Sequence, residues 1–195
     1  MLSAGLQIAA VELELAGGLA HPLFEDYADH QYPLVTPVAQ ARVAVDFLSR
    51  LSLGGSFLAV IGGEAPNRAG CCGKDSGNAA FSATALLLSL RYQSEGKPQY
   101  WVEGGMGTGH LISLQTDNSS EHPPLRGHAG ICARIATGAR WAVARNLRLG
   151  GELAWVLWTN VEQGAGQGPQ NAPAQSGLST NALLLLGSIA FSGLP

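Results

Sequence analysis

The chain is 195 residues long, has a formal net charge of −3, and combines 46% hydrophobic with only 13% charged residues. This balance excludes a disordered chain, which requires low hydrophobicity and high net charge. It also excludes a nucleic-acid-binding module, because lysine and arginine neither outnumber the acidic residues nor form a cluster. The longest apolar runs, such as 83–90 and 182–186, are far shorter than the roughly 18 residues of a membrane-spanning helix.

Hydrophobic residues recur at every second position in several segments, as in a strand whose two faces meet different surroundings. The alternation is clearest at 11–15, 42–47, 129–135 and 149–155. We predict eight strands, over residues 4–17, 37–49, 51–63, 80–93, 99–113, 128–141, 147–160 and 177–192. Each is longer than the roughly 5–6 residues of an ordinary globular strand. Each is also long enough to cross a bilayer when tilted, which takes about 9–11 residues.

The connections between the predicted strands alternate in length without exception. Long connections cover 18–36, 64–79, 114–127 and 161–176, and short ones lie near 49–50, 94–98 and 144–146. In an up-and-down antiparallel arrangement, all long loops then lie at one end, and the short turns and both termini lie at the other. Transmembrane barrels show this asymmetry, whereas a soluble sandwich has no reason to sort its loops in this way.

Charged residues share one face of each patterned strand. Glu12 and Glu14 have the same parity in the first strand, as Arg42 and Asp46 have in the second. The opposite face is aliphatic or aromatic. A soluble barrel would turn that face inward and would need abundant lysine on its outer face, but the predicted strands contain no lysine. We therefore predict that the apolar face meets lipid and that the charges line the lumen.

The predicted fold is a single all-β domain over residues 1–195, a closed eight-stranded antiparallel up-and-down transmembrane β-barrel. Such a lumen is just wide enough for side chains to fill it. Because an unpaired buried charge costs several kcal/mol, we expect arginines and carboxylates to pair across the lumen and to block flow. The predicted lumen charge network consists of Glu12, Glu14, Arg42, Asp46, Arg91, Glu103, Arg134, Arg140 and Glu152.

Aromatic residues lie near the ends of the predicted strands. Such positions are typical of the girdles that sit at the two membrane–water interfaces of a barrel. The predicted girdle residues are Tyr92, Tyr100, Trp141, Trp155 and Trp158.

Several short motifs resemble those of the small eight-stranded bacterial outer-membrane β-barrel proteins, which carry a porin-like outer-membrane β-barrel domain. Residues 50–55 (RLSLGG) and 146–153 (NLRLGGEL) are similar to the turn-to-strand element of that family. Residues 90–92 (LRY) and 98–107 (PQYWVEGGMG) are similar to its hairpin, and Phe191 resembles its C-terminal aromatic residue. The resemblance implies a Gram-negative outer membrane, with membrane lipids and lipopolysaccharide as surroundings, and a secretory signal that has been removed.

The favoured function is a structural or interaction role through the long extracellular loops, including contact with an envelope protein through the loops or the lipid-facing surface. Loop sequences such as GAGQGPQNAPAQSG at 164–177 are typical of exposed segments on a rigid scaffold. Two alternatives stay open. One is a narrow gated pore for small solutes, and the other is a soluble lipocalin-like barrel with an apolar ligand cavity.

No catalytic, cofactor or metal site is predicted. His110 and Ser113 have opposite strand parity and therefore cannot form a dyad in a regular strand. His128 is interpreted as a polar residue at a strand end, and the acidic segment 24–30 lacks the spacing of a calcium loop. The adjacent Cys71 and Cys72, in a glycine-rich loop, are interpreted as loop thiols without chemistry.

Overall fold

The computed structural model describes residues 10–23, 35–61, 64–66, 78–116, 125–127, 129–163 and 178–194. The long strands are β1 (Ala10–Leu23), β2 (Thr36–Leu48), β3 (Leu51–Val60), β5 (Asn78–Gln93), β6 (Gln99–Thr116), β8 (Ala129–Ala144), β9 (Leu147–Gln163) and β10 (Leu178–Leu194). Two three-residue strands are also present, β4 (Glu64–Pro66) and β7 (Leu125–Gly127). Among these residues no helix has the length and apolarity of a membrane span.

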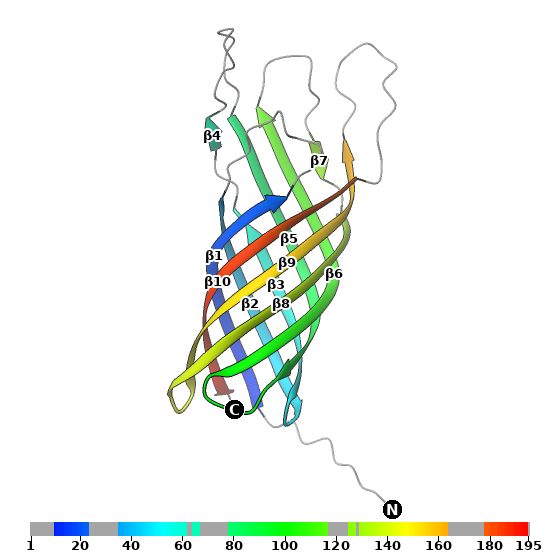
Figure 1. Cartoon of the computed structure of the whole chain (residues 1–195). Coiled ribbons are helices and arrows are strands. Elements are labelled where there is room, and N and C mark those ends of the chain that lie inside the picture. The colour runs from blue at the N-terminus through cyan, green and yellow to red at the C-terminus, as the bar shows by residue number, and fades with distance from the viewer. Residues whose placement is uncertain are drawn as a thin grey trace, which may run out of the picture.

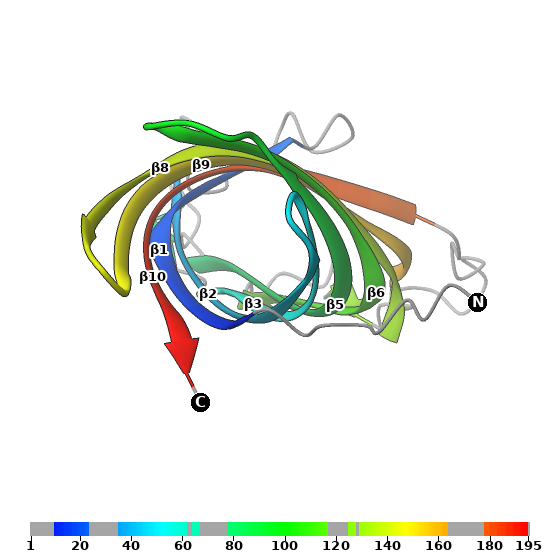
Figure 2. The same ribbon diagram turned by 90° about the horizontal axis from the view of Figure 1, so that it is seen from below.

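The eight long strands form a closed antiparallel barrel, which confirms the predicted fold class. Each long strand pairs with the next long strand along the chain, and β1 pairs with β10 to close the ring. Figure 1 shows the strands strongly tilted against the barrel axis, and Figure 2, seen along that axis, shows the closed ring. Closure gives each of the eight long strands two neighbours, so the ring has no edge that a bilayer could not satisfy with hydrogen bonds.

The first strand differs from its predicted extent of 4–17, because β1 continues to Leu23. The predicted loop began at Gly18. The structure gives this glycine a packing role in the strand instead. A Cβ at Gly18 would lie 2.0 Å from the carbonyl oxygen of Leu185, so only glycine fits where β1 and β10 approach each other.

The short strands β4 and β7 lie at the barrel end that carries the long connections. β4 pairs with the beginning of β5, and β7 pairs with the end of β9. Three residues are too few to produce a periodic hydrophobic pattern, which explains why the sequence did not predict either strand.

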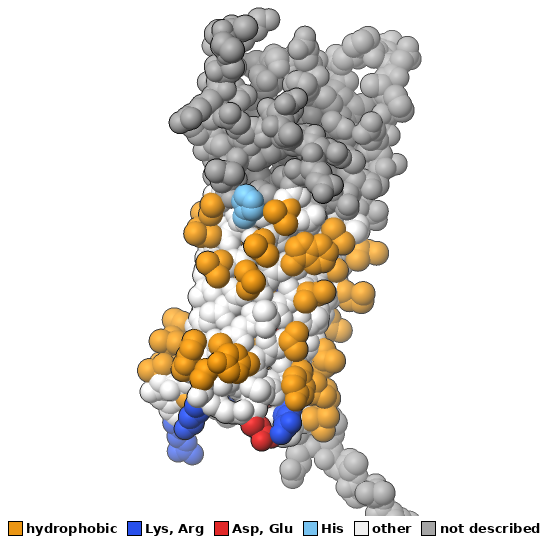
Figure 3. Space-filling model, viewed as in Figure 1, with side chains coloured by type: hydrophobic (Ala, Val, Ile, Leu, Met, Phe, Trp, Pro, Cys, Tyr) orange, Lys and Arg blue, Asp and Glu red, His pale blue; other side chains and the backbone are white. Residues whose placement is uncertain are grey.

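Side chains alternate between the lumen and the outer wall, and the polarity is that of a membrane barrel. Arg42 is 1% exposed, whereas its neighbour Val43 is 52% exposed. Apolar residues cover much of the wall, and on the face drawn in Figure 3 the Lys, Arg, Asp and Glu side chains gather at the short-turn end. This distribution does not fit the soluble lipocalin-like alternative, whose outer face would be polar.

The aromatic residues divide between the two faces. Tyr92, Tyr100, Trp141 and Trp155 lie on the outer wall. The prediction was wrong for Trp158, which is 1% exposed and lies in the lumen, where its Nε1 donates a hydrogen bond to the carbonyl oxygen of Thr84. A position near a strand end does not by itself determine which face a residue occupies.

Candidate functional site

The lumen contains an ionic layer with Glu103 near its centre. One Glu103 carboxylate oxygen lies 2.8 Å from Nε of Arg91 and 2.9 Å from Nε of Arg42, and the other accepts a hydrogen bond from Arg134. Strands β2, β5, β6 and β8 supply these four side chains, and each is at most 1% exposed. One carboxylate thus contacts three guanidinium groups.

Glu12 forms a second centre nearer the short turns. Its two carboxylate oxygens accept hydrogen bonds from Arg140 at 2.6 Å and from Arg148 at 2.8 Å. Arg42 and Arg91 lie farther away, at 3.7 and 3.9 Å, and connect this centre to Glu103.

Three further contacts extend the ionic layer. Arg91 donates a hydrogen bond to Glu14 at 2.7 Å, and its guanidinium carbon lies 4.0 Å from the ring centroid of Trp101, within the range of a cation–π contact. Arg134 donates a hydrogen bond to Glu152 as well as to Glu103. A single connected network therefore spans six strands.

The structure brings together eight of the nine residues predicted for the lumen network. Asp46 lies at the edge of this network, near enough to Glu12, Arg140 and Arg148 to interact with them electrostatically. It is half-buried on the inner face of β2, and the described residues give it neither an ion pair nor a hydrogen bond. Its register opposite Ala10 places it at the short-turn end of the lumen, where the ionic layer gives way to solvent.

Four side chains of the site are missing from the predicted network, although strand parity indicates them. The sequence pattern already places Arg148 on the charged face with Glu152, and Gln93 has the parity of Arg91. Gln93 and Gln99 accept hydrogen bonds from Arg140, at 2.5 and 2.8 Å respectively. The fourth is Trp101, two residues before Glu103 on the same face.

An apolar layer fills the lumen between the ionic layer and the long-loop end. We define it by Val38, Leu58, Leu87, Val156, Trp158 and Leu184, all members of one buried cluster. On β2, Val38 is four residues closer to the loop end than Arg42, and on β9 Trp158 is six residues closer than Glu152. The interior of the barrel therefore changes from ionic to apolar along its axis.

Two polar side chains lie where the layers meet. Gln40 and Ser56 are buried on the inner face, and their side-chain polar atoms have no hydrogen-bond partner in the described part of the chain. A buried polar group without a partner is costly, and water commonly satisfies such groups inside proteins.

The chemistry considered from the sequence finds little support in the described residues. His110 has the outward parity of Met106, and within the described ranges no group of three or more His, Cys, Asp or Glu side chains is placed to hold a metal ion. Cys132 is a free, buried thiol. Cys71, Cys72, His128, the acidic segment 24–30 and the side chain of Ser113 lie outside the described residues.

An exposed ion pair marks the short-turn rim. Both Nε and Nη2 of Arg50, in the β2–β3 turn, donate hydrogen bonds to one carboxylate oxygen of Glu95, in the β5–β6 turn, at 2.9 and 2.7 Å. This hydrogen bond raises the pKa of Arg50 above its ordinary value. The pair joins two neighbouring turns.

No family model matches the chain, and no curated protein matches its sequence. Its fold is similar to that of Ail, the attachment invasion locus protein of Yersinia pestis, with a TM-score of 0.56 and 9% identity over 94% of this chain and 97% of that chain. A major outer membrane protein from Thermus thermophilus gives a TM-score of 0.55 and 15% identity over 94% and 99% of the two chains. The outer membrane protease OmpT from Escherichia coli gives a TM-score of 0.53 and 7% identity over 97% of this chain and 99% of that chain.

These identities are too low to show more than the fold. The closed barrel and its apolar wall together define a transmembrane β-barrel, and its fold is that of the matched outer-membrane barrels. Because a protease is among the matched structures, the fold alone does not decide whether this chain catalyses a reaction.

Proposed function

We propose that this chain is an integral outer-membrane barrel with a plugged lumen, which acts as a structural anchor and presents its long loops to partners outside the membrane. The ionic layer and the apolar layer, stacked along one axis, support this proposal most directly. We further propose that the barrel catalyses no reaction, because opposite strand parity separates His110 and Ser113, the candidate catalytic pair.

The plug has a physical basis in the width of the barrel. An eight-stranded lumen has room for side chains and little else. Here arginines from opposite sides of the wall share carboxylates, so each long side chain spans part of the cross-section. Moving one of them aside to admit a solute would break charge-assisted hydrogen bonds in a buried setting, which costs several kcal/mol.

The interaction role rests on the asymmetry of the two barrel ends. Four connections of more than ten residues lie at one end, and such loops on a rigid scaffold commonly carry recognition. A barrel of this fold supports attachment in Ail, as the name of that protein states. Lipopolysaccharide and envelope proteins are the surroundings that these loops and the outer wall would meet.

A narrow pore for small solutes is the second candidate. Gln40 and Ser56 favour it, because unpartnered polar groups inside the lumen are suited to bind water or a small polar solute. A continuous path would also have to cross the apolar layer, where Trp158 and Leu58 are almost completely buried.

Conductance in planar bilayers distinguishes the two candidates. The purified full chain is reconstituted beside a known porin as positive control. We expect no stable current steps from the wild type. A double variant, Leu58→Ala with Trp158→Ala, should add at most brief events, because the ionic layer remains. Stable, ion-selective steps from the folded wild type would reject the plug and favour the pore.

The loop role is tested by cross-linking in intact outer membranes. The wild-type chain is compared with a variant in which 164–177 is replaced by a short glycine–serine turn, with folding checked by heat-dependent migration on a gel. We expect specific cross-linked species that the shortened variant loses. Identical cross-linking patterns for the two chains would contradict a role for this loop.

A further inference from the structure

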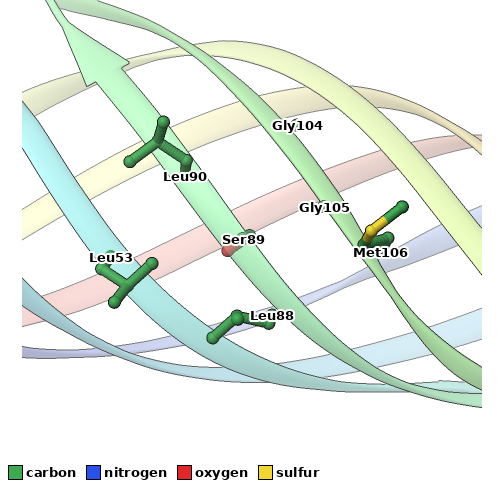
Figure 4. A pocket seen from close by; sticks show the side chains of 7 residues that line it. All are labelled: Leu53, Leu88, Ser89, Leu90, Gly104, Gly105 and Met106. Atoms are coloured by element: carbon green, nitrogen blue, oxygen red, sulfur yellow. The ribbon is translucent and has the colours of Figure 1, made fainter.

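The outer wall contains an open groove of about 360 Å³ where β3, β5 and β6 lie side by side. In Figure 4 the side chains of Leu53, Leu88, Leu90 and Met106 form its walls. Gly104 lies at its floor, opposite Leu90 in the β5–β6 register. The groove faces away from the lumen and is separate from both layers of the plug.

Missing side chains create the groove. A Cβ at Gly104 or at the neighbouring outward position Gly55 would meet no atom within 4 Å. Neither residue has the positive φ that favours glycine. Neither the backbone nor the packing of the barrel therefore requires glycine here, in contrast to Gly107 on the same strand, where a Cβ would lie 1.9 Å from the carbonyl oxygen of Leu86.

The groove leads toward a basic turn at the membrane interface. Below Leu90, the next outward residue of β5 is Tyr92, and Ser94 begins the turn to β6, four residues or about 13 Å along the strand. Tyr92 is 46% and Tyr100 is 59% exposed, as expected for rings at the level of lipid headgroups.

Together with the neighbouring β2–β3 turn, this turn carries an excess of one positive charge, from Arg50, Glu95 and Lys97. Arg50 and Glu95 neutralise each other, and Lys97, two residues farther on, is exposed and has no ion-pair partner among the described residues. A free cation directly below an apolar groove, with exposed tyrosines between them, matches the chemistry of a lipid with a negative headgroup. A zwitterionic headgroup also has a phosphate, but its own cation offsets the attraction of that phosphate to Lys97.

We propose that the groove and this turn form a binding site for one anionic phospholipid of the leaflet at the short-turn side. One acyl chain lies in the groove between Leu90 and Met106, and the headgroup phosphate contacts Lys97, with the guanidinium of Arg50 beside it. Because the acyl chain is in an apolar medium whether bound or free, its fit in the groove contributes to the binding affinity through packing. The charge of Lys97 provides the selectivity for the headgroup.

Native mass spectrometry of the full chain in detergent tests this site. Phosphatidylglycerol and phosphatidylcholine with identical acyl chains are titrated in parallel. We expect a one-to-one adduct with phosphatidylglycerol that binds about fivefold more tightly than the phosphatidylcholine adduct, the ratio given by one basic residue near a charged membrane surface. Lys97→Gln should abolish this preference, whereas Arg145→Gln, an equal charge change on the β8–β9 turn, should retain it.

A second pair of variants tests the groove. Gly104→Leu fills it, and Gly151→Leu places the same side chain on the outer face of β9, where the nearest atom to a Cβ is 3.9 Å away. We expect Gly104→Leu to weaken the adducts of both lipids about threefold, and Gly151→Leu to leave both unchanged. Heat-dependent migration checks folding, and Gly104→Val replaces Gly104→Leu if that variant does not fold.

Three results would overturn the proposal. One is equal affinity of the wild type for the two lipids. Another is equal weakening by Lys97→Gln and Arg145→Gln, which would indicate diffuse surface charge. The third is a lipid-free dimer of the wild type that disappears only in Gly104→Leu. That result would make the groove an interface between two copies of the chain.

Discussion

The two halves of the lumen fill the same narrow space in different ways. In the ionic layer, each group depends on particular partners, as Glu103 does on its three arginines. In the apolar layer, Leu184 and Val156 need only neighbours of suitable volume. The difference teaches that the ionic half should be sensitive to the identity of its residues, and the apolar half to their size.

Glu103→Ala is expected to have the largest effect. It removes the shared carboxylate and leaves the buried Arg42, Arg91 and Arg134 without a main counter-charge. We expect the free energy of unfolding to fall by about 3–5 kcal/mol, as for other broken buried pairs. Urea unfolding in lipid vesicles measures the change. If the free energy of unfolding fell no more than in the exposed variant Glu95→Ala, the ionic layer would not contribute to stability.

Leu184→Ala is expected to have the next largest effect. The side chain is fully buried in the apolar layer, so its removal leaves a cavity and costs about 2–4 kcal/mol. The same unfolding measurement applies. Leu184→Met, which conserves volume, should cost less than about 1.5 kcal/mol. If Leu184→Met were as damaging as Leu184→Ala, the view that this half depends on volume would be wrong.

A double-mutant cycle on Arg134 and Glu152 sharpens the comparison. Arg134→Met or Glu152→Gln alone leaves a buried group without its partner, whereas the double variant removes both charges. We expect the double variant to be about 1–3 kcal/mol more stable than the sum of the two single effects. Strict additivity would mean that the hydrogen bond between them contributes nothing to stability.

The exposed pair of Arg50 and Glu95 should show the smallest effect. Glu95→Ala should shift the unfolding midpoint least among these variants, and high salt should remove the difference. Because the pKa of Arg50 is raised, the stability that its charge contributes through the pair is fully present below the ordinary arginine pKa. That stability is lost only as pH rises through the raised pKa. The wild-type midpoint should therefore show no step from Arg50 between about pH 6 and pH 9.

The sequence predicted the barrel because a period of two, repeated in eight segments, specifies strands with two unlike faces. The inward residues of the ionic layer follow from parity alone. Their partners do not, because pairing depends on the register between strands and on tilt, and a single sequence shows neither. This is why Asp46 was grouped with Arg42, although the described residues give it no ion pair.

The errors have different causes. Trp158 was assigned to the girdle by its position near a strand end, although it has the parity of Glu152 and therefore lies on the inner face. Gly18 was predicted to begin a loop, but here β1 and β10 approach too closely for any side chain. For Gly18 the deciding contact comes from a strand remote in sequence.

The pairing of β1 with β10 has a consequence for biogenesis. Glu12 and Arg148 are 136 positions apart in the chain, and they meet only after the earliest and latest strands have joined. A half-assembled ring would expose its carboxylates and guanidinium groups to the bilayer. We therefore expect membrane insertion and the pairing of β1 with β10 to occur as one concerted event. Partially assembled intermediates should stay in water or bound to a chaperone until the last hairpin has formed.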